Sequence, residues 1–153
     1  AARVALLEPV EGKREVAGRL GADLCIDPLH ENVKDALAAA GMNWINTVIE
    51  CVGRPSTMEQ AIEIAGNKAV VMMFGLTKPE DTIAIKPFQI FQKELKASYI
   101  NPYTQKRALE LIDSGRLDVS SMVSEVCGLD RLEDILSRPE IRAKGKYIIS
   151  PEK

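Results

Sequence analysis

The sequence predicts an α/β protein built on a doubly wound, mostly parallel sheet. Short apolar strand patterns alternate with helical patterns of about ten residues along most of the chain. Several of the strand patterns are continuous apolar runs, which are typical of strands covered on both faces by helices. A chain of 153 residues can bury a substantial core, and we expect residues 1–153 to form a single domain.

Each expected element follows from its apolar pattern and from the residues that interrupt it. Proline cannot donate to a sheet ladder, and glycine commonly follows the last turn of a helix, so these two residues mark most of the boundaries. In chain order, the sequence predicts strands at 3–8, 22–26, 47–52, 67–75, 82–85, 95–100, 123–127 and 146–150, and helices at 11–20, 31–40, 56–66, 88–93, 102–115 and from 130 onward.

The stretch at residues 47–59 is the centre of the functional prediction. Residues 47–52 form a mostly β-branched apolar run, which indicates a buried strand. Gly53 breaks this run, and Ser56 and Glu59 have the spacing of a capping box that opens a helix. Ligands of open α/β sheets bind just beyond the carboxyl ends of the strands, so we expect a binding site at the loop after Gly53.

Two later segments carry specific expectations. Residues 82–85 alternate polar and apolar side chains between two prolines, which indicates an edge strand. Asn101 can cap the following helix, with Pro102 at its first position. The buried face of that helix would consist of Ala108, Leu111 and Ile112.

Composition and charge exclude several classes of function. Hydrophobic residues make up 46% of the chain and the net charge is -2, which gives no reason to expect a nucleic-acid or membrane partner. No apolar run approaches the roughly 20 residues of a membrane-spanning helix. The three cysteines, Cys25, Cys51 and Cys127, are far apart, and we expect them to be small apolar side chains in strands of a cytoplasmic protein.

Glu8 is the sharpest single signal for a ligand. An acidic residue at the carboxyl end of a strand can accept hydrogen bonds from a ribose diol, and its charge repels a 2′-phosphate, which favours NAD over NADP. The alternative is a solvated turn carboxylate. A Gly-x-Gly-x-x-Gly loop normally precedes such an acid by about 20 positions, and the sequence contains no such loop. Either the acid is a coincidence or the chain is cut after its phosphate-binding loop.

The sequence offers no catalytic residue or metal ligand. It contains one histidine, His30, which lies in a polar stretch and is expected at the surface near a helix start. There is no Cys-x-x-Cys or His-Glu-x-x-His spacing and no Gly-x-Ser-x-Gly nucleophile motif.

Residues 4–22, 48–53, 69–76 and 95–117 together resemble the coenzyme domain of the medium-chain, zinc-containing alcohol dehydrogenases, especially the branch of the sorbitol and threonine dehydrogenases. The order and spacing of the motifs extend over nearly the whole chain. They are Val4-Ala5-Leu6-Leu7-Glu8 with Lys13, Leu20-Gly21-Ala22-Asp23, Val48-Ile49-Glu50-Cys51-Val52-Gly53, Val70-Val71-Met72-Met73-Phe74-Gly75, Lys93-Glu94-Leu95-Lys96-Ala97-Ser98-Tyr99, and the helix at 107–117.

The resemblance implies a Rossmann-like fold that lacks its first strand and glycine-rich loop, with NAD as coenzyme. Glu8 would hold the adenosine ribose, with Lys13 beside it and Arg54 near the adenine. Glu8 and Gly53 would flank one crevice. The nucleotide cleft would be lined by Cys51, Val52 and Gly53. The nicotinamide carboxamide would meet Phe74, Gly75 and Leu76 and the backbone of Ser98, Tyr99 and Ile100. Lys146 is a further candidate, for the pyrophosphate. In this family the strand at 82–85 pairs with a second subunit, so the resemblance implies a homodimer.

The family's zinc and its ligands belong to a separate domain that no part of this sequence resembles. We therefore expect the carboxyl-terminal part of a longer enzyme, which passes hydride between NAD and a zinc-bound alcohol or polyol, and we expect this part alone to be inactive. One alternative is a non-catalytic module that dimerises or binds a nucleotide. Another is a zinc-free, quinone-reductase-like protein that uses NADPH, against which the acidic Glu8 argues.

Overall fold

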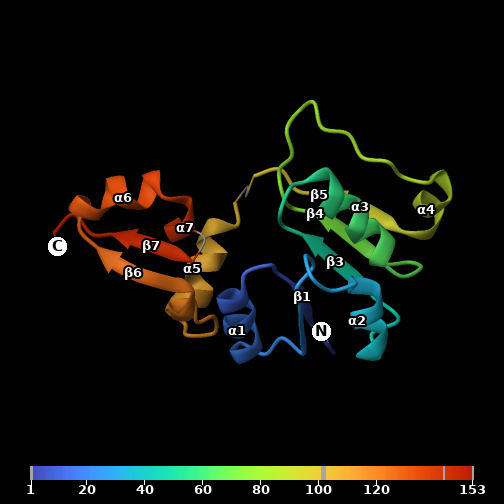
Figure 1. The fold of residues 1–153 in the computed structure, drawn as a ribbon, viewed down its shortest axis with the longest axis horizontal. Helices are drawn as coiled ribbons and strands as arrows, with labels where there is room; N and C mark the ends of the chain where they lie inside the picture. Colours follow the sequence, from blue (N-terminus) through green and yellow to red (C-terminus); the bar gives the residue numbers. More distant parts are fainter. Residues whose placement is uncertain (1, 101–102, 143, 153) are drawn as a thin grey trace. The chain divides into compact units, whose positions relative to one another are not determined.

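The fold was determined as a computed structural model, which describes residues 2–100, 103–142 and 144–152. Strands and helices alternate along the chain, and the paired strands are parallel (Figure 1). In the described residues the strands form three sheets, with the orders β1-β2, β3-β4-β5 and β6-β7. This arrangement confirms the predicted α/β class with parallel strands.

The chain divides into two compact units. The terminal unit consists of Ala1–Ala36 and Lys106–Lys153, and the central unit of Leu37–Gln105. The expectation of a single domain over residues 1–153 stays a prediction.

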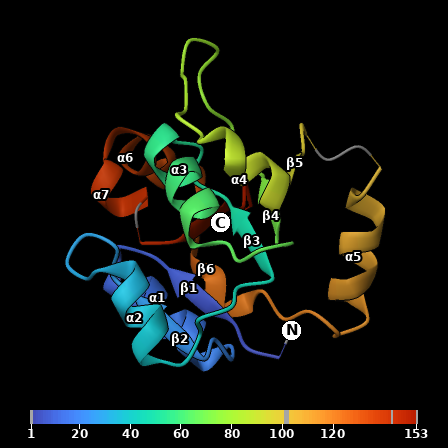
Figure 2. The ribbon, with the colours of Figure 1, turned by 90° about the vertical axis from the view of Figure 1, so that its right-hand side faces the viewer.

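In the terminal unit, β1 (Ala5–Leu7) and β2 (Leu24–Ile26) lie side by side, with α1 (Glu11–Arg19) between them in sequence (Figure 2). The helix ends before Gly21, whose φ of +99° is accessible to glycine at little cost. Ile26 is fully buried. The next helix, α2 (Val33–Ala39), begins in this unit.

The remainder of the terminal unit contains a second parallel pair, β6 (Val123–Cys127) and β7 (Lys146–Ile149). Short helices α6 (Leu132–Ser137) and α7 (Pro139–Arg142) connect the two strands, and Ile135 and Cys127 are buried there. Single 3₁₀ turns occupy Ser120–Met122 and Leu129–Arg131.

Helix α5 (Gln105–Asp113) corrects one expectation. The predicted buried face of Ala108, Leu111 and Ile112 is exposed in the structure. An apolar stripe predicts that a helix is amphipathic but does not identify the surface that covers it. The predicted cap Asn101 and first residue Pro102 lie outside the described residues.

In the central unit, β3 (Thr47–Glu50), β4 (Val70–Met73) and β5 (Glu94–Ala97) form a three-stranded parallel sheet. Helix α3 (Pro55–Ile64) packs against β3 and β4 (Figure 1, Figure 2). Between them lies the core of this unit, formed by Ala61, Ile62, Ala65, Ala69 and Val71. The short helix α4 (Pro87–Gln92) precedes β5.

The predicted edge strand at 82–85 is wrong, because these residues form no strand in the structure. The amide of Ala84 donates to Glu59 Oε1 on α3 at 2.8 Å, and Ile83 and Ile85 pack against the core of the central unit. Residues 82–85 are therefore held against α3 by the Glu59 side chain, and they do not pair with a neighbouring strand.

The start of α3 also differs from the prediction. The helix begins at Pro55, and Thr57 rather than Glu59 closes its first turn, since the Arg54 amide donates to Thr57 Oγ1 at 3.3 Å. The Thr57 amide donates in return to the Arg54 carbonyl at 3.1 Å. A proline at the first helical position suits this arrangement, because its missing N–H needs no partner there.

Within the described ranges, no helix combines the length and the apolar character that crossing a membrane would require.

Candidate functional site

Glu50, the last residue of β3, is a buried carboxylate at the carboxyl end of the central sheet, with 5% of the residue exposed. Its Oε1 accepts hydrogen bonds from the amides of Val52 at 2.8 Å and Gly53 at 2.9 Å, and Thr57 Oγ1 lies 2.8 Å away. A buried carboxylate is tolerated only where such donors replace water. The side chain therefore turns the chain from the strand into the loop that leads to α3.

Two glycines bring the loops after β3 and β4 into direct contact. The amides of Phe74 and Gly75 both donate to the Glu50 carbonyl, at 2.8 and 2.9 Å. A Cβ on Gly75 would overlap the backbone nitrogen of Gly53, and a Cβ on Gly53 would overlap the carbonyl oxygen of Leu76. Gly53 also has a φ of +78°. Side chains other than hydrogen do not fit at either position, so the two loops form one packed structure.

Large apolar side chains stand exposed at this edge of the central sheet. Val52, Phe74 and Leu76 are exposed by 60%, 48% and 73%, although all three flank the packed glycines. Tyr99 and Ile100 follow β5 and are each exposed by 72%. Because β3, β4 and β5 are parallel, these five residues follow the same ends of neighbouring strands. We call them the apolar wall.

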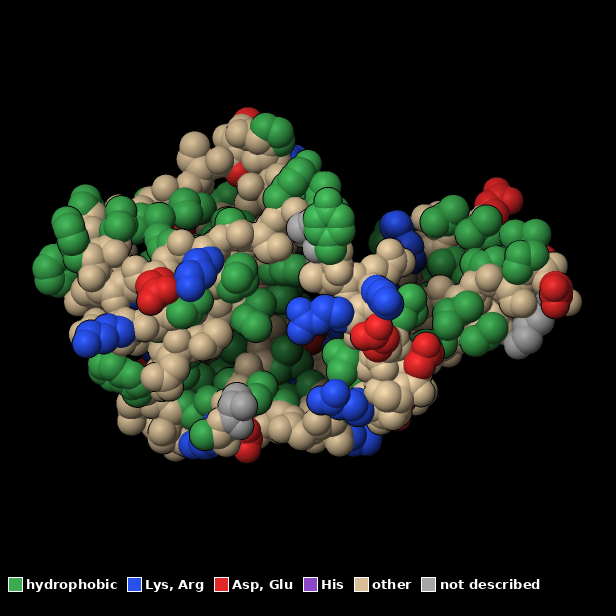
Figure 3. Space-filling view, turned by 180° about the vertical axis from the view of Figure 1, so that it is seen from behind, with side chains coloured by type: hydrophobic (Ala, Val, Ile, Leu, Met, Phe, Trp, Pro, Cys, Tyr) green, Lys and Arg blue, Asp and Glu red, His purple; other side chains and the backbone are tan. Residues whose placement is uncertain are grey.

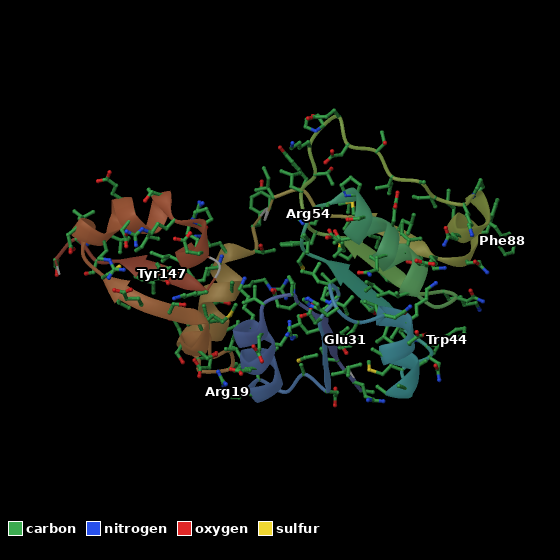
Figure 4. The ribbon with its side chains drawn as sticks, in the orientation of Figure 1. Arg19, Glu31, Trp44, Arg54, Phe88 and Tyr147 are labelled. Atoms are coloured by element: carbon green, nitrogen blue, oxygen red, sulfur yellow. The ribbon has the colours of Figure 1, made fainter. Side chains whose placement is uncertain are left out.

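The remaining predicted residues of the central unit lie around this wall. Ser98 is hydrogen-bonded to β4, since its amide donates to the Met73 carbonyl at 3.1 Å. Arg54 is exposed at the start of α3 (Figure 4). Cys51 follows β3 instead of lying inside it and is exposed, which corrects the expectation of a packed strand residue. Partial burial of the thiol, and then the Glu50 charge, raise the pKa of Cys51, so it is not an activated nucleophile.

In the terminal unit, Glu8 directly follows β1 and is half-buried. Its Oε1 accepts a hydrogen bond from the Val10 amide at 2.9 Å, while Oε2 has no partner among the residues that the structure describes. Arg14 on α1 donates to the Glu8 carbonyl at 2.7 Å and pairs with Asp27 at 3.2 Å. One carboxylate oxygen of Glu8 therefore remains available to a ligand hydroxyl.

Asp27 gives this cluster a pH dependence that can be measured. The hydrogen bond from the Leu29 amide lowers the pKa of Asp27 below its usual 3.8, burial opposes this shift, and His30 and Arg14 add to it. Folding therefore favours the ionised carboxylate. The resulting stability is fully present above pH 3.8, the unfolded value, and is lost as the pH falls through the lower folded pKa.

We expect Asp27→Asn to be less stable than the parent chain near neutral pH, and we expect this difference to shrink below the unfolded pKa. Urea unfolding at several pH values between neutral and strongly acidic conditions measures both quantities. A difference that stays constant over the whole range would contradict the assignment of ionised Asp27 to the folded state.

Several residues of this geometry were not predicted from the sequence. The sequence shows Glu50 only as part of a motif and predicts no role for Thr57, Arg14 or Asp27. The sequence does contain a signal for Glu50 and Thr57. Glu50 is a carboxylate near the end of a β-branched run, and the hydroxyl of Thr57 follows seven residues later in the first turn of the expected helix. No carboxylate in the described ranges pairs with Lys13, and Lys146 is exposed at the start of β7.

In the described part of the chain, no group of three or more His, Cys, Asp or Glu residues is placed to hold a metal ion. His30 is exposed and lies 3.1 Å from Asp27 Oδ2, which agrees with its expected surface position. On the face drawn in Figure 3, Lys and Arg side chains stand among Asp, Glu and hydrophobic ones.

Comparison with known proteins identifies the family of this chain. Residues 1–128 match the family model described as zinc-binding dehydrogenase. L-threonine 3-dehydrogenase from Pyrococcus horikoshii is 27% identical over 95% of this chain, and the match spans 43% of that protein. A crystal structure of a protein from Sinorhizobium meliloti 1021 bound to NADP superposes with a TM-score of 0.90 and 28% identity, over 99% of this chain and 46% of that chain.

A further structure shares the fold at lower identity. The short chain alcohol dehydrogenase from E. coli CFT073, complexed with NADH, superposes with a TM-score of 0.82 and 15% identity, over 97% of this chain and 44% of that chain. The chain thus spans less than half the length of the relatives it matches.

Proposed function

Because the chain belongs to the zinc-binding dehydrogenase family, we propose that it is the coenzyme-binding part of an NAD-dependent alcohol or polyol dehydrogenase. The packed loops after β3 and β4 support this proposal most directly. Their glycines allow backbone to approach closely, and they present an apolar wall at the sheet edge where ligands of parallel α/β folds bind. A flat, partly apolar nicotinamide ring suits such a surface.

In the central unit, Phe74, Gly75 and Leu76, with the backbone of Ser98, Tyr99 and Ile100, would orient the nicotinamide, and Cys51, Val52, Gly53 and Arg54 would line the nucleotide side. In the terminal unit, the free oxygen of Glu8 would accept a hydrogen bond from the adenosine ribose, with Lys13 beside it. NAD supplies the hydride chemistry when bound, while the protein binds and orients it.

We propose no zinc site in the described residues, because they include no suitable group of ligands. In the complete enzyme, the metal and the walls of the alcohol site would come from other parts of the polypeptide. We accordingly expect the chain of 153 residues alone to bind coenzyme without oxidising alcohols.

The choice of NAD over NADP rests on Glu8 and is tested by its removal. A hydrogen bond to a charged group contributes about 1.5–3 kcal/mol, so Glu8→Ala should weaken NAD binding by roughly ten- to 150-fold. NADP should lose less, because the carboxylate no longer repels its 2′-phosphate. Isothermal titration with both coenzymes measures this change in preference.

Glu15→Ala is the matched control, since Glu15 is an exposed acid on the neighbouring helix α1. It should leave both affinities almost unchanged. Equal losses of NAD and NADP affinity in Glu8→Ala would count against coenzyme selection by Glu8, and an unchanged NAD affinity would remove Glu8 from the site.

The exposed side chains of the apolar wall would also suit a second candidate, a non-catalytic module that dimerises. A second copy could contact residues 82–85 at the exposed Thr82 and Ala84, but not by strand pairing, because the Ala84 amide already donates to Glu59. No heat of binding at millimolar NAD, together with a dimer in sedimentation equilibrium, would favour this candidate over a coenzyme-binding part.

A further inference from the structure

Glu50 connects two loops through two different parts of the same residue. Its carboxylate accepts from the loop after β3, at the amides of Val52 and Gly53, and its carbonyl accepts from the loop after β4, at the amides of Phe74 and Gly75. Both loops carry members of the apolar wall. A displacement of Glu50 would therefore move both sides of the wall together.

Thr57 contacts the same carboxylate oxygen as the loop amides. Its hydroxyl lies 2.8 Å from Glu50 Oε1 and 2.9 Å from the Arg54 carbonyl, and donates its single proton to one acceptor at a time. Because Thr57 belongs to the first turn of α3, this contact links the loop position to the start of the helix. Glu50 is thus fixed between a helix and two loops.

The space around the carboxylate leaves little freedom to rearrange. Glu50 Oε2 lies 3.2 Å from the Gly53 nitrogen, and a Cβ on Gly75 would approach this same oxygen to 2.7 Å. Replacing Oε2 by an NH₂ group would set a donor against the Gly53 amide. The site therefore accepts a carboxylate better than an amide of almost the same shape.

We propose that Glu50 is a positioning residue for coenzyme binding, which holds the loops after β3 and β4 in one preformed arrangement through its buried carboxylate and Thr57. This inference rests on the proposed function for its ligand. A wall that is already ordered loses less conformational entropy when a ligand binds, so the expected benefit is in affinity.

The first measurement is amide hydrogen exchange in the chain without coenzyme, which tests the positioning role independently of NAD binding. Glu50→Gln should accelerate exchange at Val52, Gly53, Phe74 and Gly75 at least tenfold, while the Val71 amide in the core exchanges at its usual rate. Thr57→Val, which removes only the hydroxyl, should have a smaller effect on the same amides and keeps the test valid if Glu50→Gln folds poorly. Ser56→Ala, at an exposed neighbouring hydroxyl, is the control.

The second measurement is the affinity for NAD by titration. We expect about tenfold weaker binding in Glu50→Gln, a smaller loss in Thr57→Val, and no change in Ser56→Ala. Unchanged loop exchange in both Glu50→Gln and Thr57→Val would overturn the positioning role, whatever the affinities are. Faster loop exchange with no NAD binding by the parent chain would instead refute the proposed function and leave the mechanical role of Glu50 standing.

Discussion

Replacing Gly53 by alanine is expected to lower the free energy of unfolding of the central unit by about 2–5 kcal/mol, which combines roughly 1–2 kcal/mol for a left-handed backbone with roughly 1–3 kcal/mol for overpacking. Gly53 has a φ of +78°, and its added Cβ would also lie 2.7 Å from the Leu76 nitrogen. The neighbouring atoms are backbone, which cannot rotate away. The measurement is native-state hydrogen exchange, which reports the stability of each unit separately.

Two other glycines separate the contributions to this loss. Gly115 has a φ of +68° and nothing within 4 Å of an added Cβ, so Gly115→Ala should cost only the conformational part, about 1–2 kcal/mol. Gly18 lies inside α1 with open space around it, so Gly18→Ala should stabilise the helix by about 0.5–1 kcal/mol. If Gly53→Ala costs no more than Gly115→Ala, the loops after β3 and β4 are not packed as described.

Ile62→Ala should also be strongly destabilising, by about 2–5 kcal/mol, because truncating a buried isoleucine removes its burial energy and leaves a cavity. Ile62 is 2% exposed in the core of the central unit, between α3 and the sheet. Urea unfolding followed through Trp44, the single tryptophan, which lies in the same unit, measures the loss.

Ile90→Ala provides the comparison for this substitution. Ile90 on α4 is 56% exposed, and its truncation should change stability by no more than about 0.5 kcal/mol. Similar losses for the two variants would mean that Ile62 does not lie in the core that the structure assigns to it.

The strands of the central sheet were predictable because their signal is local. Residues 47–52 and 67–75 are mostly apolar runs bounded by Gly53 and Gly75; β3 occupies the first four residues of the first run, and β4 lies in the middle of the second. The two glycines were also placed correctly at the carboxyl ends of these strands. Their direct contact with each other was not predictable, since it depends on how two strands separated by helix α3 are paired.

The errors share a physical origin in long-range contacts. Residues 82–85 have the alternation of a strand, but Glu59, 25 residues before Ala84, takes the amide of that residue. The sequence predicts a helix start at Ser56, whereas the helix begins at Pro55. The difference arises because the Arg54 amide donates to Thr57, and the expected capping pair of Ser56 and Glu59 does not form. The sequence predicts no separate role for Glu50, because its hydrogen-bond donors become neighbours only when the chain turns after β3.

The exclusive use of parallel neighbours in the described sheets has a consequence for how the protein forms. Parallel partners cannot be joined by a tight hairpin, so β1 finds β2, and β3 finds β4, only after the intervening segment with its helix has looped back. The entropy of closing these loops is lost before most of the pairing energy is gained. The nascent chain should therefore acquire its sheets slowly, with apolar strands transiently open to other chains, and should refold best at low protein concentration.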